Sequence, residues 1–285
     1  MVRGSGRDGQ AERARRRAAR ARQRAGHAAA CAERQEALAA SAGEEVHRLP
    51  AKACRRPAEC HRSSARLQEA YAERMSVWTG EETGRPRFMT GVAEACGSPG
   101  AALTLTGTGH GQLSVAASDE SSRAAQDLEF VLGEGPSRDT SVSGRPVSAS
   151  GWAIERRWPA YGPALTALGI HEVLTTPLRT EGTCIGALAD FAPDDGPAAA
   201  ATLAVTADAL LRTVLPGPDA GPGPYDGADH RDRVQQAAGM LSVQAGCRVQ
   251  DALALIEARA FAEGEPPDAV ARRIVHGRLK LAQGS

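Results

Sequence analysis

Aromatic residues, lysine and net charge are all scarce in this chain of 285 residues. Phe, Trp and Tyr make up 4% of it, so the core must be built from Ala, Val, Leu and Ile. Lys52 and Lys280 are the only lysines, and arginine supplies almost all of the positive charge. Basic and acidic residues, 34 of each, cancel to a formal net charge of zero, which argues against a uniformly basic nucleic-acid binder. The apolar fraction of 42% excludes a disordered polyelectrolyte.

Long apolar runs are absent as well. No stretch approaches 18 apolar residues without charge, so we expect no membrane contact. The start, Met-Val-Arg-Gly-Ser-Gly, has no apolar region of the kind found in signal peptides. The cysteines lack the rhythm of a secreted disulfide framework, which predicts reduced thiols and a cytoplasmic protein. They are Cys31, Cys54, Cys60, Cys96, Cys184 and Cys247.

Catalytic and metal-binding motifs are missing. The chain has no phosphate-binding G-x-x-x-x-G-K-[ST], no H-E-x-x-H and no G-x-S-x-G. Cys54, Cys60 and His61, with Cys31 as a fourth partner, suggest zinc, but their spacing matches no common ligand pair. We therefore expect no enzyme, no metal and no identifiable cofactor.

The zero total charge hides an asymmetry along the chain. Residues 1–85 carry 18 basic and 11 acidic side chains, a net charge of +7. Residues 86–227 carry 8 and 16, a net charge of −8, and residues 228–285 carry 8 and 7, a net charge of +1. The total is therefore an average over segments of different character.

Residues 1–83 form an Ala/Arg-rich leader that we expect to be helical. Residues 11–25 contain seven arginines but almost no apolar stripe beyond alanine. This run is either a contact for nucleic acid or another acidic surface, or a solvated leader whose first 30 or so residues are disordered. The spacing of apolar residues over 67–75 predicts an amphipathic helix. Pro50 and Pro57 should interrupt the preceding segment.

Residues 84–215 change from helical to strand periodicity. A hairpin is expected from strands 101–106 and 112–117 around a glycine-rich turn. Gly133 should end a helix, and a final helix should follow the sheet. The pattern predicts an α+β domain with a mostly antiparallel sheet and flanking helices. The further strands expected are 145–149, 171–179 and 183–191, and the final helix is 198–215.

Proline and glycine separate this domain from a small helical unit. Residues 215–224 contain four prolines and three glycines, which is typical of a linker, placed at 216–227. Residues 228–282 then show three amphipathic periods, with Gly246 and Gly264 at helix ends and Pro266-Pro267 opening the last helix. Three short helices are too small to enclose a substrate pocket.

Three runs in this unit resemble an ANTAR domain, a three-helix RNA-binding module of bacterial transcription antiterminators. They are Arg233-Val-Gln-Gln-Ala-Ala-Gly-Met-Leu241, residues 251–260 and residues 269–275. The resemblance implies pairing as a homodimer and binding of RNA stem-loops in the nascent transcript. The RNA-binding residues expected from it are Arg231, Arg233, Gln236, Ala237, Ala238, Gly239 and Arg259.

Physical reasons support these residues, and one alternative stands beside them. A small-residue patch at Ala237-Ala238-Gly239 would let RNA approach the helix backbone, and arginines supply phosphate contacts and stacking planes. The alternative for the patch is close helix packing. The chain departs from the ANTAR pattern at Ala238 and Glu257, where basic residues are usual, and at Ser242, where Met is usual.

Motifs upstream resemble a GAF domain of the kind fused to ANTAR. They are Leu132-Gly-Glu-Gly-Pro136, Gly144-Arg-Pro-Val147, Arg157-Trp-Pro-Ala-Tyr161 and Thr176-Pro-Leu178. The resemblance implies a sensor with an unknown small-molecule ligand. Some GAF proteins reduce oxidised methionine with clustered cysteines, but this segment has only Cys96 and Cys184. The weak candidates for lining a pocket are His110, Trp158, Tyr161, His171 and Phe191.

The sequence thus predicts a cytoplasmic regulator in which a GAF sensor controls RNA binding by ANTAR and promotes antitermination. No acidic pocket of the receiver type is visible, so phosphorylation is not the expected trigger. The alternative is a degenerate homologue that works as a signal-sensing or protein-interaction module without RNA binding.

Overall fold

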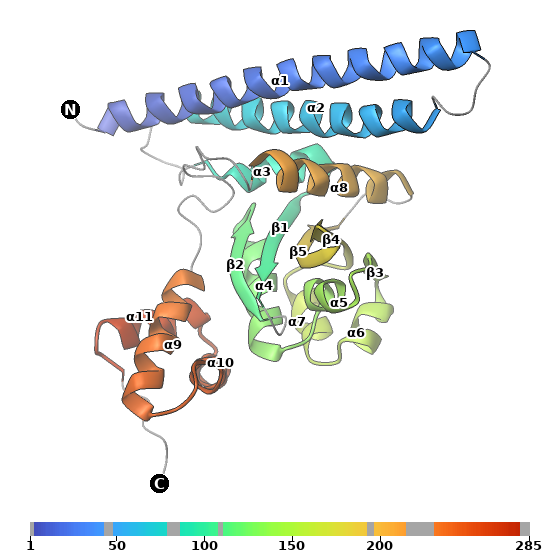
Figure 1. The fold of residues 1–285 in the computed structure, drawn as a ribbon. Helices are drawn as coiled ribbons and strands as arrows, with labels where there is room; N and C mark the ends of the chain where they lie inside the picture. Colours follow the sequence, from blue (N-terminus) through green and yellow to red (C-terminus); the bar gives the residue numbers. More distant parts are fainter. Residues whose placement is uncertain are drawn as a thin grey trace.

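The chain folds into a long helical hairpin, an α+β domain and a C-terminal unit of three helices (Figure 1). A computed structural model describes residues 3–42, 48–78, 86–107, 111–192, 197–214 and 231–279. Figure 1 shows the hairpin above the α+β domain and the C-terminal unit beside it. The expected linker, residues 216–227, lies outside the described residues.

A five-stranded antiparallel sheet, in the order β2-β1-β5-β4-β3, is the centre of the α+β domain. β1 and β2 form the expected hairpin, and β4 and β5 form a second one. The α+β prediction with a mostly antiparallel sheet is therefore confirmed. The strands are β1 (Gly100–Thr106), β2 (Gln112–Ala117), β3 (Val147–Ser150), β4 (Glu172–Thr180) and β5 (Thr183–Phe191).

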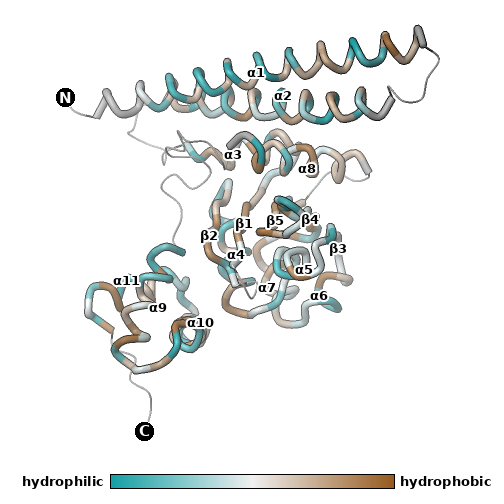
Figure 2. The backbone as a smooth tube through the Cα atoms, viewed as in Figure 1, coloured by the Kyte–Doolittle hydropathy of each residue, from teal (hydrophilic) through white to brown (hydrophobic). Residues whose placement is uncertain are grey.

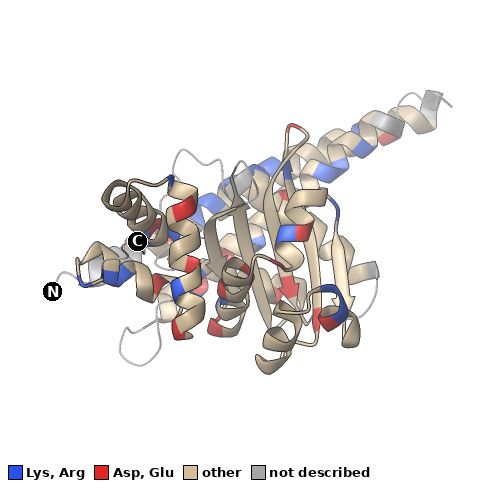
Figure 3. Cartoon of the chain, turned by 90° about the horizontal axis from the view of Figure 1, so that it is seen from below, with Lys and Arg blue, Asp and Glu red and all other residues tan. Residues whose placement is uncertain are grey.

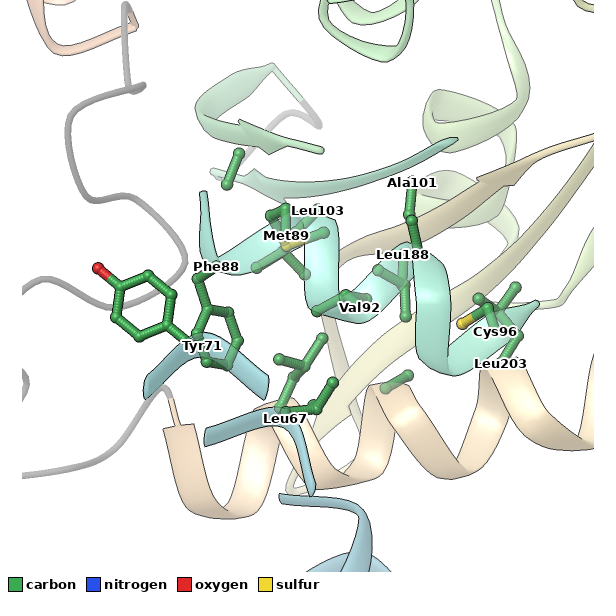
Figure 4. Close-up of a cluster of buried hydrophobic side chains, with 14 of the residues drawn as sticks. Leu67, Tyr71, Phe88, Met89, Val92, Cys96, Ala101, Leu103, Leu188 and Leu203 are labelled. Atoms are coloured by element: carbon green, nitrogen blue, oxygen red, sulfur yellow. The ribbon is translucent and has the colours of Figure 1, made fainter. Parts of the chain in front are cut away.

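Each face of the sheet is covered by its own helices and its own apolar cluster. Along β1, Leu103 faces one cluster and the adjacent Ala102 faces the other, as the two-residue period of a strand requires. On the Leu103 face lie α3 (Phe88–Cys96) and α8 (Pro197–Ala209), which continues as the π-helical turn Leu210–Val214 (Figure 4). The opposite face carries α4 (Glu120–Leu132), α5 (Pro136–Ser143), α6 (Trp152–Arg157) and α7 (Tyr161–Ala167).

The expected disorder of the first 30 residues is corrected by the structure. Helix α1 runs from Arg3 to Ala42 and packs along α2 (Arg48–Val77). The reason is an alanine stripe with alternating three- and four-residue spacing, which is the heptad period of a coiled coil. Small side chains let the two helices approach closely. The buried alanines are Ala11, Ala14, Ala18, Ala21, Ala25 and Ala32.

The hairpin also corrects the expectation that all cysteines are reduced thiols. Cys31 of α1 and Cys54 of α2 are paired in a disulfide, with Cα atoms 6.0 Å apart. Antiparallel packing of the two helices brings these residues together although 23 positions separate them in sequence. Cys60, Cys96, Cys184 and Cys247 are free.

Proline does not break α2 as the sequence suggested. Pro50 lies in the first turn, where its missing N–H has no helical partner to lose. Pro57 lies inside the helix. Packing along the length of α2 stabilises the helix despite Pro57: alanines of α1 lie on one side, and further along the helix Leu67 and Tyr71 pack against Phe88 and its neighbours (Figure 4).

The C-terminal unit consists of α9 (Arg231–Ala245), α10 (Val249–Glu263) and α11 (Pro267–Val275), as the sequence predicts. Gly264 ends α10 in the left-handed conformation. Its apolar cluster contains Val234, Leu241, Ile256 and Ile274, which are almost wholly buried. Hydropathy alternates around these short helices, with brown segments recurring between teal ones (Figure 2). Within the described residues, no helix is both long enough and apolar enough to cross a membrane.

Candidate functional site

The first residue of α9 inserts its side chain into the α+β domain. Arg231 is 1% exposed, although it was expected to contact RNA. Its Nε and Nη2 donate hydrogen bonds to Gln112 Oε1 at 3.2 and 2.9 Å, and Nη2 also donates to the Gln126 carbonyl oxygen at 3.1 Å. Nη1 lies 2.9 Å from Asp127 Oδ1. In this structure Arg231 is therefore not available for the RNA contact that the sequence predicts, because protein groups surround its guanidinium.

Apolar and aromatic contacts complete this junction. The Arg231 guanidinium carbon lies 4.2 Å from the centre of the Phe130 ring, within the range of a cation–π contact. Phe130 belongs to α4, yet it packs within the apolar cluster of the C-terminal unit. Gln235 Nε2 donates to the Gln112 carbonyl oxygen at 3.4 Å. Helix α4 and strand β2 thus bind the start of α9.

Behind Arg231, a buried hydrogen-bond chain runs into the α+β domain. Gln112 Nε2 donates to Gln126 Oε1 at 3.3 Å, and Thr104 Oγ1 donates to the same oxygen at 2.6 Å. Gln126 Nε2 in turn donates to Ser137 Oγ at 3.0 Å and to Glu129 Oε2 at 3.4 Å. All five partners of Gln126 in this chain, counting Arg231 at its carbonyl, come from different segments, so the chain ties β1, β2, α4, α5 and α9 together.

Glu129 is a buried carboxyl group at the inner end of this chain. Its Oε1 accepts a hydrogen bond from the Arg138 backbone N–H at 2.5 Å, in the first turn of α5. Burial raises the pKa of Glu129 from 4.5 to about 7, and the hydrogen bonds from Arg138 and Ser137 oppose part of that rise. Gly135 must stay glycine here, because a Cβ would lie 2.7 Å from the Glu129 side chain and its φ is +153°.

The candidates for a small-molecule pocket are only partly brought together. Trp158, Tyr161 and Phe191 lie in one packed apolar cluster, with Trp158 and Tyr161 in an edge-to-face contact at 6.2 Å. Within the described part of the chain, the Tyr161 hydroxyl has no hydrogen-bond partner, and burial together with the Glu129 charge raises the Tyr161 pKa. His171 is exposed just before β4, and His110 lies outside the described residues.

Two open grooves lie elsewhere, and the first borders the helical hairpin. One of about 730 Å³ is bounded by α2, α3 and α8, with Arg62 and Arg66 on its wall. A second of about 560 Å³ lies near Arg179 and Arg212. In the described ranges, no three His, Cys, Asp or Glu side chains are grouped to hold a metal ion.

The small-residue patch on α9 is divided between the core and the surface. Ala237 and Ala238 are 0% exposed and belong to the three-helix core. The structure therefore contradicts the expectation that these two residues contact RNA. Their physical role is the close packing that stood as the alternative. Gln236 is exposed, and the space above Gly239 is open, with no atom within 4 Å of where a Cβ would stand. Of the three small residues in this patch, only Gly239 leaves the helix backbone open to an approaching molecule.

The other arginines expected to bind RNA are partly exposed and paired with carboxylates. Arg233 pairs with Asp268, which also pairs with Arg272 at 3.2 Å. Arg259 Nη2 lies 2.5 Å from Glu263 Oε1. These pairs largely neutralise the unit, in keeping with its net charge of +1 (Figure 3).

The departures from the ANTAR pattern have distinct environments. Glu257 is half-buried on α10, where burial raises its pKa from 4.5 to about 7 and the charges of Arg231 and Arg138 oppose the rise. It therefore faces the α+β domain. The Ser242 carbonyl accepts the Cys247 N–H at the end of α9, a role that depends on no particular side chain.

Sequence reasoning missed the residues that surround Arg231. Gln112, Asp127 and Phe130 lie more than 100 positions away in the chain. Each has an ordinary local explanation, as part of a strand or a helix, so no spacing or motif indicates their meeting.

Comparison with known proteins adds no family. No family model matches the chain, and no curated protein matches its sequence. Function is therefore inferred from the motifs of the α+β and C-terminal domains and from the geometry above.

Proposed function

We propose that the chain is a transcription regulator whose C-terminal unit binds RNA stem-loops and promotes antitermination. In this proposal the α+β domain is a GAF-type sensor, and the protein is a cytoplasmic homodimer without catalytic activity. The observation that carries it is the coincidence of three ANTAR-like runs with α9, α10 and α11 around one apolar core.

The surface left for RNA is smaller than the sequence suggested. Gln236 and Gly239 share the exposed side of α9, and Arg233 is 41% exposed at its start. Arg233 can turn from Asp268 to a phosphate without leaving Asp268 unpaired, because Arg272 also pairs with that carboxylate. Phe261 of α10 is 68% exposed, and its ring could stack on an unpaired base.

A second function has specific support. Every arginine expected to bind RNA is buried or paired with a carboxylate, and two residues of the patch are in the core. A signal-sensing or protein-interaction module without RNA binding is therefore the alternative.

RNA carrying two small hairpins separates the two functions when binding is measured across salt concentration. Arg233→Ala should weaken binding to all sequences and lower the salt slope by about 0.7 to 0.9, the loss of one phosphate contact. Arg248→Ala is the matched control, because Arg248 is 80% exposed, pairs with Asp251 and lies beyond the other end of α9. No binding at low salt would leave only the second function.

A further inference from the structure

We propose that Arg231 is a latch that docks the C-terminal unit on the α+β domain, and that the buried chain Gln112–Gln126–Glu129 links this latch to the domain interior. The consequence for RNA rests on the proposed function: docking buries Arg231, one of the residues expected to bind RNA, and so holds the unit in a state that binds RNA weakly. The latch itself depends only on the contacts of Arg231.

The first argument is that Arg231 is recognised by a built site. Four different groups of the α+β domain contact the guanidinium: the Gln112 amide, the Gln126 carbonyl, the Asp127 carboxylate and the Phe130 ring. A guanidinium buried with one close carboxylate is strongly destabilised when that partner is lost. Docking should therefore be sensitive to single substitutions on α4.

The second argument is that docking can be undone without leaving unpaired charge on the α+β side. Asp127 is also 3.7 Å from Arg123 of the same helix, so it keeps a cationic neighbour when Arg231 leaves. On the other side, Glu257 faces both Arg231 and Arg138 and would move away with α10. Undocking therefore leaves neither Asp127 nor Glu257 as an isolated buried charge beside Arg231.

The third argument is the composition of the sequence between the two parts. Residues 215–224, with four prolines and three glycines, have the composition of a linker. Docking then rests on the contacts of α9 and α10 with α4 and β2, in which Arg231 is the most buried charged side chain.

The fourth argument concerns communication. Arg231 donates to the backbone carbonyl of Gln126, and the Gln126 side chain orders Gln112 by accepting from its Nε2 while donating to Ser137 and Glu129 on the inner side. A ligand or proton that displaces Glu129 would change the partners available to Gln126. That change would reach Arg231 through the Gln112 amide.

The latch is tested in the full chain with Asp127→Asn, which keeps the side-chain shape and removes the charge. Hydrogen–deuterium exchange of the first two turns of α9 should rise by on the order of tenfold, and affinity for paired-hairpin RNA should rise by a similar factor. Glu120→Gln is the matched control, because Glu120 is an exposed carboxylate on the same helix that pairs with Arg87 and Arg123. It should change neither readout.

The possible outcomes test separately the docking by Arg231, its effect on RNA binding and the proposed function. Unchanged exchange in α9 overturns the latch, whatever happens to RNA. Increased exchange with equal or weaker RNA affinity overturns the regulatory role. If neither variant nor the unchanged chain binds RNA at low salt, the proposed function fails, while the exchange result still decides whether Arg231 docks the unit.

Communication is tested with Gln126→Leu against Thr140→Val. Both replace a fully buried polar side chain, but Thr140 bonds Thr175 outside the chain that leads to Arg231. Gln126→Leu should increase exchange in α9, and Thr140→Val should not. Equal increases from both variants would mean general destabilisation and would overturn the link.

Discussion

Replacing Glu129 with glutamine should change how the stability of the protein depends on pH. The carboxyl group has a pKa of about 7 when folded, against an ordinary value of 4.5, because it is buried. Between these values the folded chain binds more protons at Glu129 than the unfolded chain does, so stability falls as pH rises. Integrating over pH 5 to 8 gives a loss of about 2.5 kcal/mol from this one group.

The variant removes that loss, because glutamine does not titrate. The new side-chain amide would meet two donors, the Arg138 N–H and the Gln126 amide, so a pH-independent cost of about 1–3 kcal/mol is also expected. The unfolding free energy of the wild type minus that of the variant should therefore fall by about 2.5 kcal/mol from pH 5 to pH 8. The constant cost does not affect this difference.

Urea unfolding of both proteins, followed by tryptophan fluorescence, measures the gap, since Trp158 is buried in the same domain. Glu134→Gln is the control: Glu134 accepts from the Ala160 and Tyr161 N–H groups at 2.6 and 2.8 Å, and its loss leaves Glu129 in place. That variant should be less stable at all pH values but keep the wild-type slope. A gap for Glu129→Gln that stays constant within about 0.5 kcal/mol would refute the reasoning.

Two further predictions test packing. Ala18→Leu should destabilise the hairpin by about 1–3 kcal/mol in urea unfolding, because Ala18 is fully buried between α1 and α2; the exposed neighbour Ala19→Leu should change stability by less than about 0.5 kcal/mol, and equal effects would contradict the alanine stripe. Gly186→Ala should lower the melting temperature far more than Gly182→Ala. A Cβ at Gly186 would lie 2.0 Å from the Thr104 carbonyl oxygen, whereas Gly182 has a positive φ but open space, and similar losses would show that backbone conformation alone matters.

The strands and the short helices could be predicted because their signals are local. Alternation over 183–191 predicts β5, and Gly133 and Gly264 end α4 and α10 in the left-handed conformation that glycine adopts readily. The two hairpins expected from the sequence, β1–β2 and β4–β5, both occur in the five-stranded antiparallel sheet. Nothing in those signals depends on the rest of the chain.

The hairpin was predicted less well for an energetic reason. The alanines of α1 recur with the heptad period, but a methyl group buries little area, so the stripe carries a weak hydrophobic signal beside seven arginines. Only the second helix shows that those alanines are covered. The same packing carries Pro57 inside α2 and brings Cys31 to Cys54.

For the candidate site, too, some features follow from the sequence and others only from the tertiary structure. The sequence by itself determined three amphipathic helices in the C-terminal unit and a chain whose neutrality averages segments of opposite charge. Only the tertiary structure decided that Ala237 and Ala238 are core and that Arg231 is buried against Gln112 and Asp127. The reason is that periodicity reports which side of a helix is apolar, whereas the partner of a charged side chain is set by residues far away in sequence.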